Sequence, residues 1–222
     1  MGPMTTEISE TETERPLRAD AARNRELILE TAAEVFAELG LDAGYDEIAR
    51  RAGIGVGTVY RRFPQRAELV QALFESRIQE IVDLAEEAAR TTDAFEGLAW
   101  FLERALEHQV ADRGLKEVMA QTISADDHGT IGRERIGPVI DVLLERAQAE
   151  GSIRPDIAST DLGMQLMLIS SMTTTAQPDL WRRYLALFLD GLRAHPDLAP
   201  LPLTAPPDEA MHEFKCNVYG GR

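Results

Sequence analysis

The sequence predicts an all-α protein with an N-terminal three-helix domain containing a helix-turn-helix, and a larger C-terminal helical bundle domain that forms a homodimer. Apolar residues recur at helical spacing along most of the chain. A glycine turn separates two short amphipathic segments near the N-terminus. The last two apolar segments are hydrophobic on nearly every side, which is typical of a subunit interface.

Composition indicates a cytoplasmic globular protein. Of the 222 residues, 44% are hydrophobic and 27% are charged, and no apolar run reaches the roughly eighteen residues that a membrane span needs. The N-terminus is acidic, the reverse of a secretory signal, and the single cysteine, Cys216, excludes an intramolecular disulfide. The net charge of −15 argues against diffuse attachment to nucleic acid or to an anionic membrane, so no membrane partner is expected.

The chain begins with an acidic segment that leads into the first helix. Residues 1–20 are rich in Thr and Glu and poor in apolar side chains, so we expect them to be disordered. The first helix carries an apolar stripe from Ile28 to Leu39 and ends at Gly40. The arginines before this stripe form a basic arm that either lies along a DNA minor groove or is merely solvated: Arg15, Arg18, Arg23 and Arg25.

The stretch 44–66 predicts two short helices joined by a tight turn. Ala49 supplies the small residue that steeply crossing helices need where they meet. Gly53 stands where the chain leaves the first helix, a position that favours the left-handed conformation open to glycine. The second helix is expected over 56–63, with Val59 turned into the core.

The second of these helices has the chemistry of a DNA-reading element. Gly55 and Gly57 leave its N-terminal end without bulk, so that backbone N–H groups can approach a phosphate. Arginine pairs bidentately with guanine in the major groove, and Thr and Tyr commonly bond phosphates. The candidate DNA-binding residues are Arg23, Gly55, Gly57, Thr58, Tyr60, Arg61, Arg62 and Arg66.

A local excess of positive charge supports this interpretation. Residues 43–66 contain five basic and two acidic residues, a balance of +3 within a chain of net charge −15. The alternative is a surface helical hairpin in which glycine caps a helix and arginine is only solvated. The shared register of Ala49, Gly53 and the arginines favours the DNA-binding helix-turn-helix.

The same residues resemble the N-terminal domain of the TetR family of transcriptional regulators. The first helix, RNRELILETAAEVFAELG, the pattern G-x-G-T-x-Y-x-x-F at 55–63 and the basic Arg66 all match that family, within residues 23–73. The sequence departs from the family where Gly44 and Gly55 replace the frequent Thr or Ser at the helix N-caps. The resemblance implies a repressor whose C-terminal domain binds a small-molecule effector.

Six further helices are expected after the helix-turn-helix. A long apolar stripe predicts one continuous helix over 67–89. This helix is too long for the DNA-binding domain (the head) alone and should connect it rigidly to the C-terminal domain (the body). The cluster Thr91-Thr92-Asp93 caps the start of the next helix. That helix ends near Asp112, and the others are expected at 115–123, at 134–150 with Pro138 near the start, at 160–172 and at 179–194.

The last two helices are expected to form the dimer interface as a four-helix bundle across a two-fold axis. Both are apolar nearly all round, and a chain of this size cannot easily bury both sides of both. The candidate interface residues are Met172, Trp181, Tyr184, Leu185 and Phe188. Two symmetric recognition helices about one DNA turn apart, roughly 34 Å, require a palindromic operator in double-stranded DNA.

An effector site is expected between the helices of the body, because the body is larger than dimerisation needs and helical bodies hold ligands between helices. The candidate walls are bulky or polar residues off the main apolar stripes: Trp100, Phe101, Met119, Thr122 and Met164. Met164, Met167 and Met172 fit an ordinary core better than a pliable pocket. The expected regions are a disordered segment over 1–20, a DNA-binding domain over 21–66, an effector-binding and dimerisation domain over 67–195, and a Pro-rich flexible tail over 196–222.

No pattern in the sequence predicts an enzyme, a metal site or a cofactor. The four histidines are far apart without metal-binding spacing, and Asp126-Asp127-His128 fits a solvated acidic loop better than a metal site. The sequence has no G-x-S-x-G elbow, phosphate loop or Rossmann glycine pattern. The alternative to a DNA-binding regulator is a helical interaction module whose helix-turn-helix contacts protein.

Overall fold

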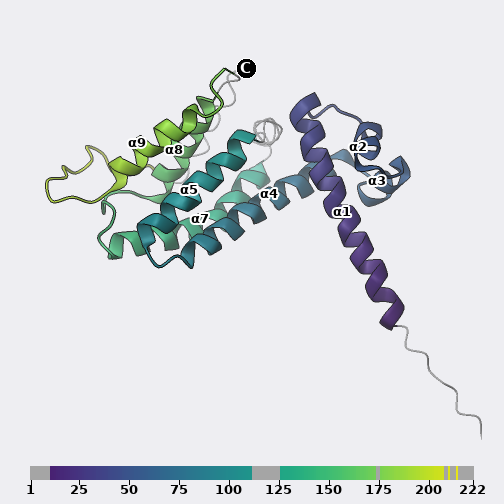
Figure 1. Ribbon diagram of the computed structural model, residues 1–222, viewed down its shortest axis with the longest axis horizontal. Coiled ribbons are helices and arrows are strands. Elements are labelled where there is room, and N and C mark those ends of the chain that lie inside the picture. Colours follow the sequence, from purple (N-terminus) through teal and green to yellow (C-terminus); the bar gives the residue numbers. More distant parts are fainter. Residues whose placement is uncertain (1–10, 112–125, 174–175, 208–209, 211–213, 215–222) are drawn as a thin grey trace, which may run out of the picture. The chain divides into compact units, whose positions relative to one another are not determined.

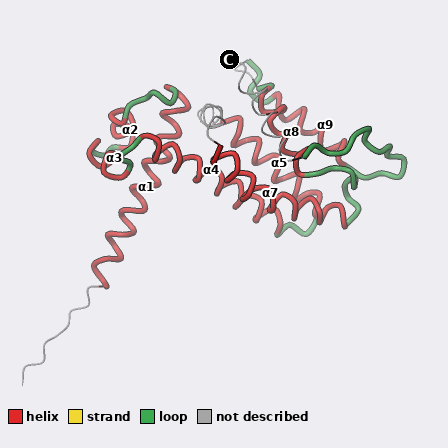
Figure 2. Tube along the Cα trace, turned by 180° about the vertical axis from the view of Figure 1, so that it is seen from behind, coloured by secondary structure: helices red, strands yellow, loops and turns green. Residues whose placement is uncertain are grey.

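The computed structural model describes residues 11–111, 126–173, 176–207, 210 and 214. Regular structure in these ranges is helical, apart from isolated bridge residues such as the antiparallel pair Ile153 and Arg193 (Figure 1, Figure 2). The helices are α1 (Thr11–Leu39), α2 (Tyr45–Ala52), α3 (Val56–Arg62), α4 (Arg66–Ala89), α5 (Ala94–Ala111), α7 (Asp126–Ala149), α8 (Ser159–Ser171) and α9 (Leu180–Leu192). The predicted all-α class is confirmed. No described helix is both long and apolar enough to cross a membrane.

The chain divides into two compact units, Met1–Ala72 and Leu73–Arg222. The helix α4 belongs to both, because it begins at Arg66 in the first unit and ends at Ala89 in the second. Its 24 residues make a rod of about 36 Å at ~1.5 Å per residue. The boundary predicted from the sequence lies at 66–67, at the start of this helix. The two units divide at 72–73, a few residues inside it.

The first unit is closed around the buried stripe of α1. Ile28 and Phe36 of α1, Ile48 of α2 and Val59 of α3 are all essentially inaccessible to solvent, and α2 contacts both α1 and α3. The turn between α2 and α3 has Gly53 at φ 66°, a left-handed conformation that costs glycine little. The amides of Gly53 and Ile54 bond the carbonyls of Arg50 and Ala49 at 3.4 and 3.0 Å, so the last carbonyls of α2 are satisfied.

The start of α1 differs from the sequence-based expectation. The helix begins at Thr11, so residues 11–20, which were expected to be disordered, are helical, and the basic arm from Arg15 to Arg25 is part of α1. Glu, Arg, Leu and Ala predominate in this stretch, and these residues have high intrinsic helix propensity. The low hydrophobicity of the stretch 11–20 predicts disorder, but helix formation does not require a buried face at every turn. Residues 1–10 lie outside the described ranges.

The second unit is organised around α5, which contacts α7, α8 and α9. Four α5 side chains are almost completely buried in its core: Leu98, Phe101, Leu102 and Leu106. Leu144 of α7, Leu162 of α8 and Trp181 of α9 belong to the same cluster. On the surface, Arg182 of α9 pairs with Glu103 and Glu107 of α5 at 2.7 and 2.8 Å. The core and these ion pairs hold α9 against α5.

The helix α7 starts earlier than the sequence predicts. It begins at Asp126, whereas the expected start was Glu134, so Pro138 lies in its interior rather than near its start. Proline lacks the N–H of the helical ladder and its ring opposes the carbonyl of residue 134, which normally costs about 3 kcal/mol. Burial of Leu143, Leu144 and their neighbours along α7 offsets that cost. The predicted helix over 115–123 lies outside the described residues.

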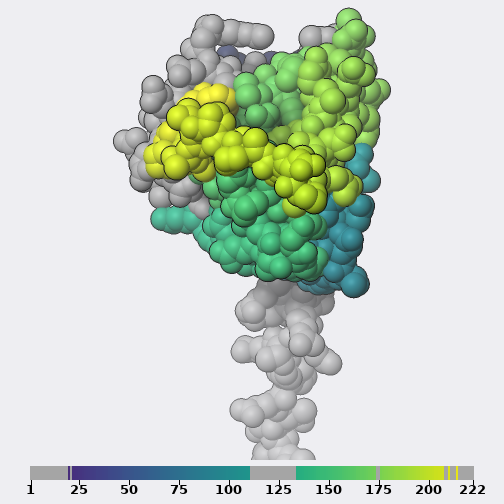
Figure 3. Space-filling model, turned by 90° about the vertical axis from the view of Figure 1, so that its left-hand side faces the viewer, coloured from purple at the N-terminus to yellow at the C-terminus, as the bar shows by residue number. Residues whose placement is uncertain are grey.

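The described part of the tail is held against the second unit, although the sequence predicts flexibility over 196–222. Arg154 is 8% exposed and forms two bonds to Asp156, at 2.6 and 2.9 Å. Its guanidinium also donates to the carbonyl of Ala199 at 3.0 Å, while Asp156 accepts the amide of Leu201 at 2.7 Å. Figure 3 shows the chain after α9 lying across the surface of the α7–α8 region. The prolines of this segment predict mobility. The sequence alone does not reveal the contacts with Arg154 and Asp156 that hold the segment in place.

Replacing the tail anchor should release the segment. In Asp156→Ala, the amide of Leu201 and the buried Arg154 guanidinium lose their acceptor, and a charge-assisted bond contributes about 1.5–3 kcal/mol. We expect proteinase K to cleave residues 198–203 roughly tenfold faster or more, as followed by mass spectrometry. Asp197→Ala, which removes an exposed carboxylate of the same segment, is the matched control. Equal cleavage of both variants would contradict the anchor.

Candidate nucleic-acid interface

The start of α3 is open and lacks a side-chain cap. Gly44 precedes α2 and Gly55 precedes α3, both with extended backbone (φ −77° and −70°) and neither with a side-chain cap. The amide of Thr58 bonds the carbonyl of Gly55 at 2.8 Å, which closes the first turn of α3. A Cβ atom added at Gly55 or Gly57 would meet nothing within 4 Å. The space above this turn is therefore open to a phosphate or a base edge.

The exposed face of α3 carries the polar and charged candidates. Val59 alone points fully into the core, and Thr58 is half-buried beside it. Tyr60 is 55% exposed, and Arg61 and Arg62 are exposed as well. The structure thus brings four of the candidate DNA-binding side chains together on a helix of seven residues, 56–62.

The ring of Tyr60 packs against that of Tyr45, a residue that the sequence-based candidates do not include. The rings of Tyr45 and Tyr60 make an edge-to-face contact with centroids 4.8 Å apart and an interplanar angle of 63°. Tyr45 is 6% exposed, and its burial raises the pKa of its phenol. The helical period that places Ile48 and Ala49 inward also places Tyr45 there, so this signal was present in the sequence.

Two of the arginines counted in the basic region are neutralised within the first unit. Glu47 bonds Arg50 at 2.6 and 2.8 Å and Arg51 at 2.8 Å. Arg51 also reaches Glu38 of α1 at 2.7 Å, so it joins α1 to α2. The hydrogen bonds from Arg50 and Arg51 lower the pKa of Glu47 to about 2. Glu47 and Glu38 thus offset the charge of both α2 arginines, while Arg61 and Arg62 lie exposed on α3.

This network predicts a pH-dependent contribution to stability. The carboxyl of Glu47 has a folded pKa of about 2 against an ordinary value of 4.5, so its contribution is complete above ~4.5 and is lost as the pH falls towards 2. Glu47→Gln should therefore lower the urea midpoint at pH 7, and the difference from wild type should shrink at pH 2.5. Glu34→Gln, an exposed substitution on α1, serves as the control. A difference that is constant with pH would exclude this role of the Glu47 charge.

The remaining arginine candidates have partners inside the first unit. Arg66 donates to the carbonyl of Ala43 at 3.0 Å and lies over the Phe36 ring at 5.3 Å, so it joins the start of α4 to α1. Arg23 is exposed on α1 and bonds Asp20. We conclude that Arg66 has a structural role in the head, whatever it contacts outside.

Comparison with known proteins agrees with this geometry. A family model described as "Bacterial regulatory proteins, tetR family" matches residues 28–73, and one described as "Transcriptional regulator SbtR-like, C-terminal domain" matches residues 93–194. A TetR transcription regulatory protein from Mycobacterium vanbaalenii is 32% identical with a TM-score of 0.64, covering 81% of this chain and 100% of that one. The chain belongs to the TetR family of transcriptional regulators.

Other similar proteins match different shares of the chain. The regulator SCO0520 from Streptomyces coelicolor is 34% identical with a TM-score of 0.66, over 77% of this chain and 98% of that one. The HTH-type regulator TtgW of Pseudomonas putida is 42% identical over 64 residues, 28% of this chain and 48% of TtgW. The activator FasR of Mycolicibacterium smegmatis is 38% identical over 77 residues, 34% of each. The chain thus matches less than half the length of these two curated relatives.

The candidate effector residues of this TetR-family chain are only partly brought together. Phe101 is buried in the core of the second unit, Trp100 packs half-buried against that core, and Met164 of α8 is half-buried. The sequence places Phe101 off the main apolar stripe of α5. Because α7, α8 and α9 all contact α5, the second face of this helix is also buried in the core. Met119 and Thr122 lie outside the described residues.

The candidate interface residues also separate into two groups. Trp181 is 2% exposed and Leu185 is 5% exposed, so both are core residues of their own subunit rather than surface contacts. The half-buried Met172 and Phe188 pack against the same core. Tyr184 is exposed and is followed one turn later by Leu187, which is 57% exposed. The outer apolar face of α9 is therefore formed by Tyr184 and Leu187.

Proposed function

We propose that this protein is a homodimeric, sequence-specific DNA-binding repressor that reads a palindromic operator with α3 and releases it when a small effector binds the second unit. The observation that carries the proposal is the exposed face of α3, which presents Thr58, Tyr60, Arg61 and Arg62 around one buried anchor, Val59. Hydroxyls and guanidinium groups on a short exposed helix match the donor and acceptor pattern of a DNA major groove.

The residues of the head divide between reading and anchoring. Arg61 is proposed to reach a base edge, since a planar guanidinium pairs bidentately with guanine. Tyr60 and Thr58 are proposed to bond phosphates, with Tyr60 held in place by the ring of Tyr45. The bare backbone at Gly55 and Gly57 leaves room for close approach of the DNA. Arg62 is proposed to add positive charge on the same exposed helix, and Arg23, which pairs with Asp20 in the free protein, is proposed to contact a phosphate from α1.

Charge favours DNA over protein as the partner of α3. The chain carries −15, so its average field repels nucleic acid. A cationic α3 on such a chain is proposed to localise binding to one surface, because Glu47 and Glu38 together offset the two arginines of α2. The alternative, a helical interaction module whose helix-turn-helix binds an acidic protein surface, uses the same charge but does not need the open glycine turn.

Dimerisation is proposed to use the outer face of α8 and α9. Leu168 of α8 and Tyr184 and Leu187 of α9 are large apolar side chains left exposed in one subunit. A two-fold axis buries the same face of both subunits at once. Two α3 helices about 34 Å apart would then contact successive major grooves on one side of a palindromic site.

The DNA-binding proposal is tested by selection from a random duplex pool, followed by gel shifts with unlabelled competitor. We expect enrichment of an inverted repeat and binding that tolerates excess random duplex. An Arg61→Ala/Arg62→Ala double variant should lose the shift, whereas Arg104→Ala, an exposed substitution on α5, should retain it. Selection without an enriched motif would favour the protein-interaction module.

The effector part of the proposal has its own measurement. A ligand found by thermal-shift screening is titrated by calorimetry into the free protein and into the operator complex. Allosteric release requires the operator to weaken ligand binding by the same factor by which the ligand weakens operator binding, a coupling of about 1–3 kcal/mol. Equal affinities in the two titrations would rule out regulation by that ligand.

A further inference from the structure

Two arginines on the last turn of α2 are held by one carboxylate of the same helix. The Arg50 guanidinium donates to Glu47 at 2.6 and 2.8 Å, and Arg51 donates to it at 2.8 Å. The side chain of Arg50 is 69% exposed, whereas that of Glu47 is 27% exposed. Within the described ranges, Glu47 is the only side-chain partner of Arg50. One carboxylate therefore occupies a cation that otherwise faces solvent.

The two arginines differ in what else holds them. Arg51 is 23% exposed and also pairs with Glu38 of α1 at 2.7 Å, so it joins α2 to α1. The acceptor of Arg50 lies three residues earlier on the same helix, and the pair joins no other element. Ion pairs of this kind between exposed side chains contribute little to stability. The packing of the head therefore depends on Arg51 far more than on Arg50.

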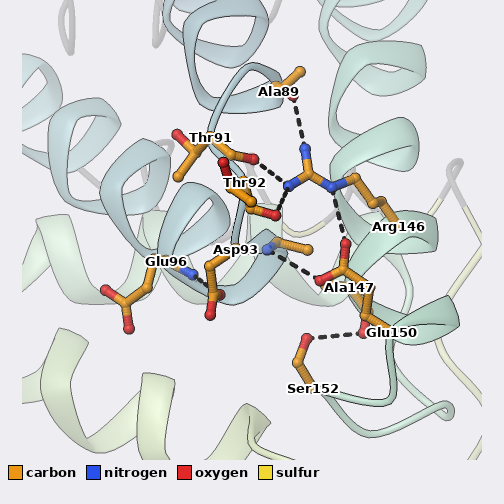
Figure 4. A network of polar contacts seen from close by, with 10 residues as sticks. Ala89, Thr91, Thr92, Asp93, Glu96, Arg146, Ala147, Glu150 and Ser152 are labelled. Carbon is orange, nitrogen blue, oxygen red and sulfur yellow. Dashed lines mark hydrogen bonds and ion pairs between the residues drawn. The ribbon is translucent and has the colours of Figure 1, made fainter.

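An arginine of the second unit illustrates what a structural guanidinium does. Arg146 of α7 donates to the carbonyl of Ala89, the last residue of α4, at 2.7 Å (Figure 4). It also donates to the carbonyls of Thr91 and Thr92 in the connection that follows. These carbonyls lie at a helix end, where no intrahelical donor reaches them. In the described part of the chain, Arg50 donates to no carbonyl, so it can exchange its carboxylate for another anion without leaving a backbone group unpaired.

Arg50 also lies beside the turn that leads into α3. Its carbonyl accepts the Gly53 amide at 3.4 Å, and α3 begins at Val56, three residues after that glycine. When a helix-turn-helix binds DNA, its first helix crosses the phosphate backbone while its second helix enters the major groove. A guanidinium binds phosphate with the same forked geometry that it uses for a carboxylate. Phosphate is therefore the anion that can compete for Arg50.

We propose that Arg50 is a latent phosphate-binding residue and that Glu47 restrains it, so that Glu47 limits the affinity of the head for DNA of any sequence. The inference rests on the proposed function, because it requires α2 and α3 to meet a duplex. Phosphate contacts carry no sequence information and supply nearly all of the affinity for random DNA. A carboxylate that occupies Arg50 removes one such contact and leaves the side chains of α3 unchanged.

Two simpler explanations of Glu47 predict different results. If Glu47 acts only through its negative charge, the loss of any nearby carboxylate strengthens DNA binding equally. Asp46, which is exposed beside it on α2, provides this comparison. If Glu47 only stabilises the head, its replacement lowers the urea midpoint without strengthening DNA binding. Restraint of Arg50 predicts a gain in affinity that disappears when Arg50 is removed as well.

The experiment measures binding of the full-length protein to a random-sequence duplex by fluorescence anisotropy, at about 50 and about 200 mM salt. The variants are Glu47→Gln, Arg50→Ala and the double variant, with Asp46→Asn as the matched control. Glu47→Asp is a second way to release Arg50, because it keeps the charge but shortens the side chain. Urea unfolding of each variant checks that the head is folded under the binding conditions.

We expect Glu47→Gln to bind random duplex about tenfold more tightly at the lower salt concentration, and the gain to shrink by about 3.5-fold per added phosphate contact at the higher one. Arg50→Ala alone should change the affinity of the wild type by about twofold or less, since Glu47 already occupies this side chain, and the control should change it no more. The double variant should lose the gain. Glu47→Asp should show part of it.

Three results overturn the restraint: no gain in a folded Glu47→Gln protein, a gain that persists without Arg50, or an equal gain in Asp46→Asn. If Glu47→Gln does not fold, a gain in Glu47→Asp supports the restraint and its absence overturns it. Failure of the wild type to select an operator refutes the proposed function, while the variants on random duplex still decide the role of Glu47. Absence of binding to any duplex by every variant refutes both.

Discussion

The double variant Tyr184→Glu/Leu187→Glu is expected to be a folded monomer whose affinity for operator falls on the order of 100-fold or more. Both side chains are exposed on one face of α9, so charge there opposes a symmetric contact without entering the core of the subunit. Loss of the second half-site removes the avidity that linked binding supplies, which amounts to a factor of roughly 10²–10⁴. Sedimentation velocity and fluorescence anisotropy on the selected duplex measure the two effects.

A core substitution one residue away provides the control for this result. Leu185 is 5% exposed within its own subunit, so Leu185→Glu buries an unpaired charge and should unfold the second unit rather than separate two folded ones. Circular dichroism distinguishes the cases, since the double variant should keep its helical signal. A double variant that remains dimeric at micromolar concentration would place the interface on another surface.

Arg61→Ala and Arg66→Ala are expected to weaken DNA binding in two different ways. Loss of a base contact by Arg61 should cost about 1–3 kcal/mol and relax the preference at one base pair of each half-site. Arg66 lies over Phe36 and bonds the carbonyl of Ala43, so its removal should lower the melting temperature of the head and weaken binding to all sequences alike. Competition with duplexes changed at single positions, together with thermal melts, measures both.

Matched substitutions separate these effects from the loss of positive charge alone. Arg61→Lys keeps the charge and should still relax the base preference, because lysine cannot form the bidentate pair. Arg90→Ala removes an exposed arginine at the far end of α4 and should leave both the preference and the melting temperature unchanged. Identical sequence preferences in Arg61→Ala and Arg66→Ala would remove the distinction between reading and support.

The helix boundaries were largely predictable because they depend on local chemistry. Gly40, Gly53 and Gly151 have φ between 66° and 79°, and each follows the end of a predicted helix. The long helix was expected over 67–89 and observed from Arg66 to Ala89. Helical periodicity and the glycines that end helices depend only on residues a few positions apart. The sequence alone therefore reveals them. The exposed residues of α3 were identified by the same local pattern.

The errors arose where distant residues decided the outcome. The apolar sides of α9 predict Trp181 and Leu185 at the subunit interface, but α9 contacts α5 and both side chains are buried within one subunit. The tail was expected to be mobile, but Arg154 and Asp156, which precede it by about forty residues, hold its described part. Burial and hydrogen bonding depend on partners that sequence spacing does not reveal.

By itself the sequence determined the class of fold, the helix-turn-helix and the chemistry of its second helix. Each of these follows from periodicity, from glycine and from charge over short stretches. Only the tertiary structure decided that the ring of Tyr45 contacts that of Tyr60, that Arg51 of α2 pairs with Glu38 of α1, and that Arg146 of α7 bonds the carbonyl of Ala89 at the end of α4. Each of these contacts joins residues on different helices, and its free energy depends on a distance that is set only when the helices pack.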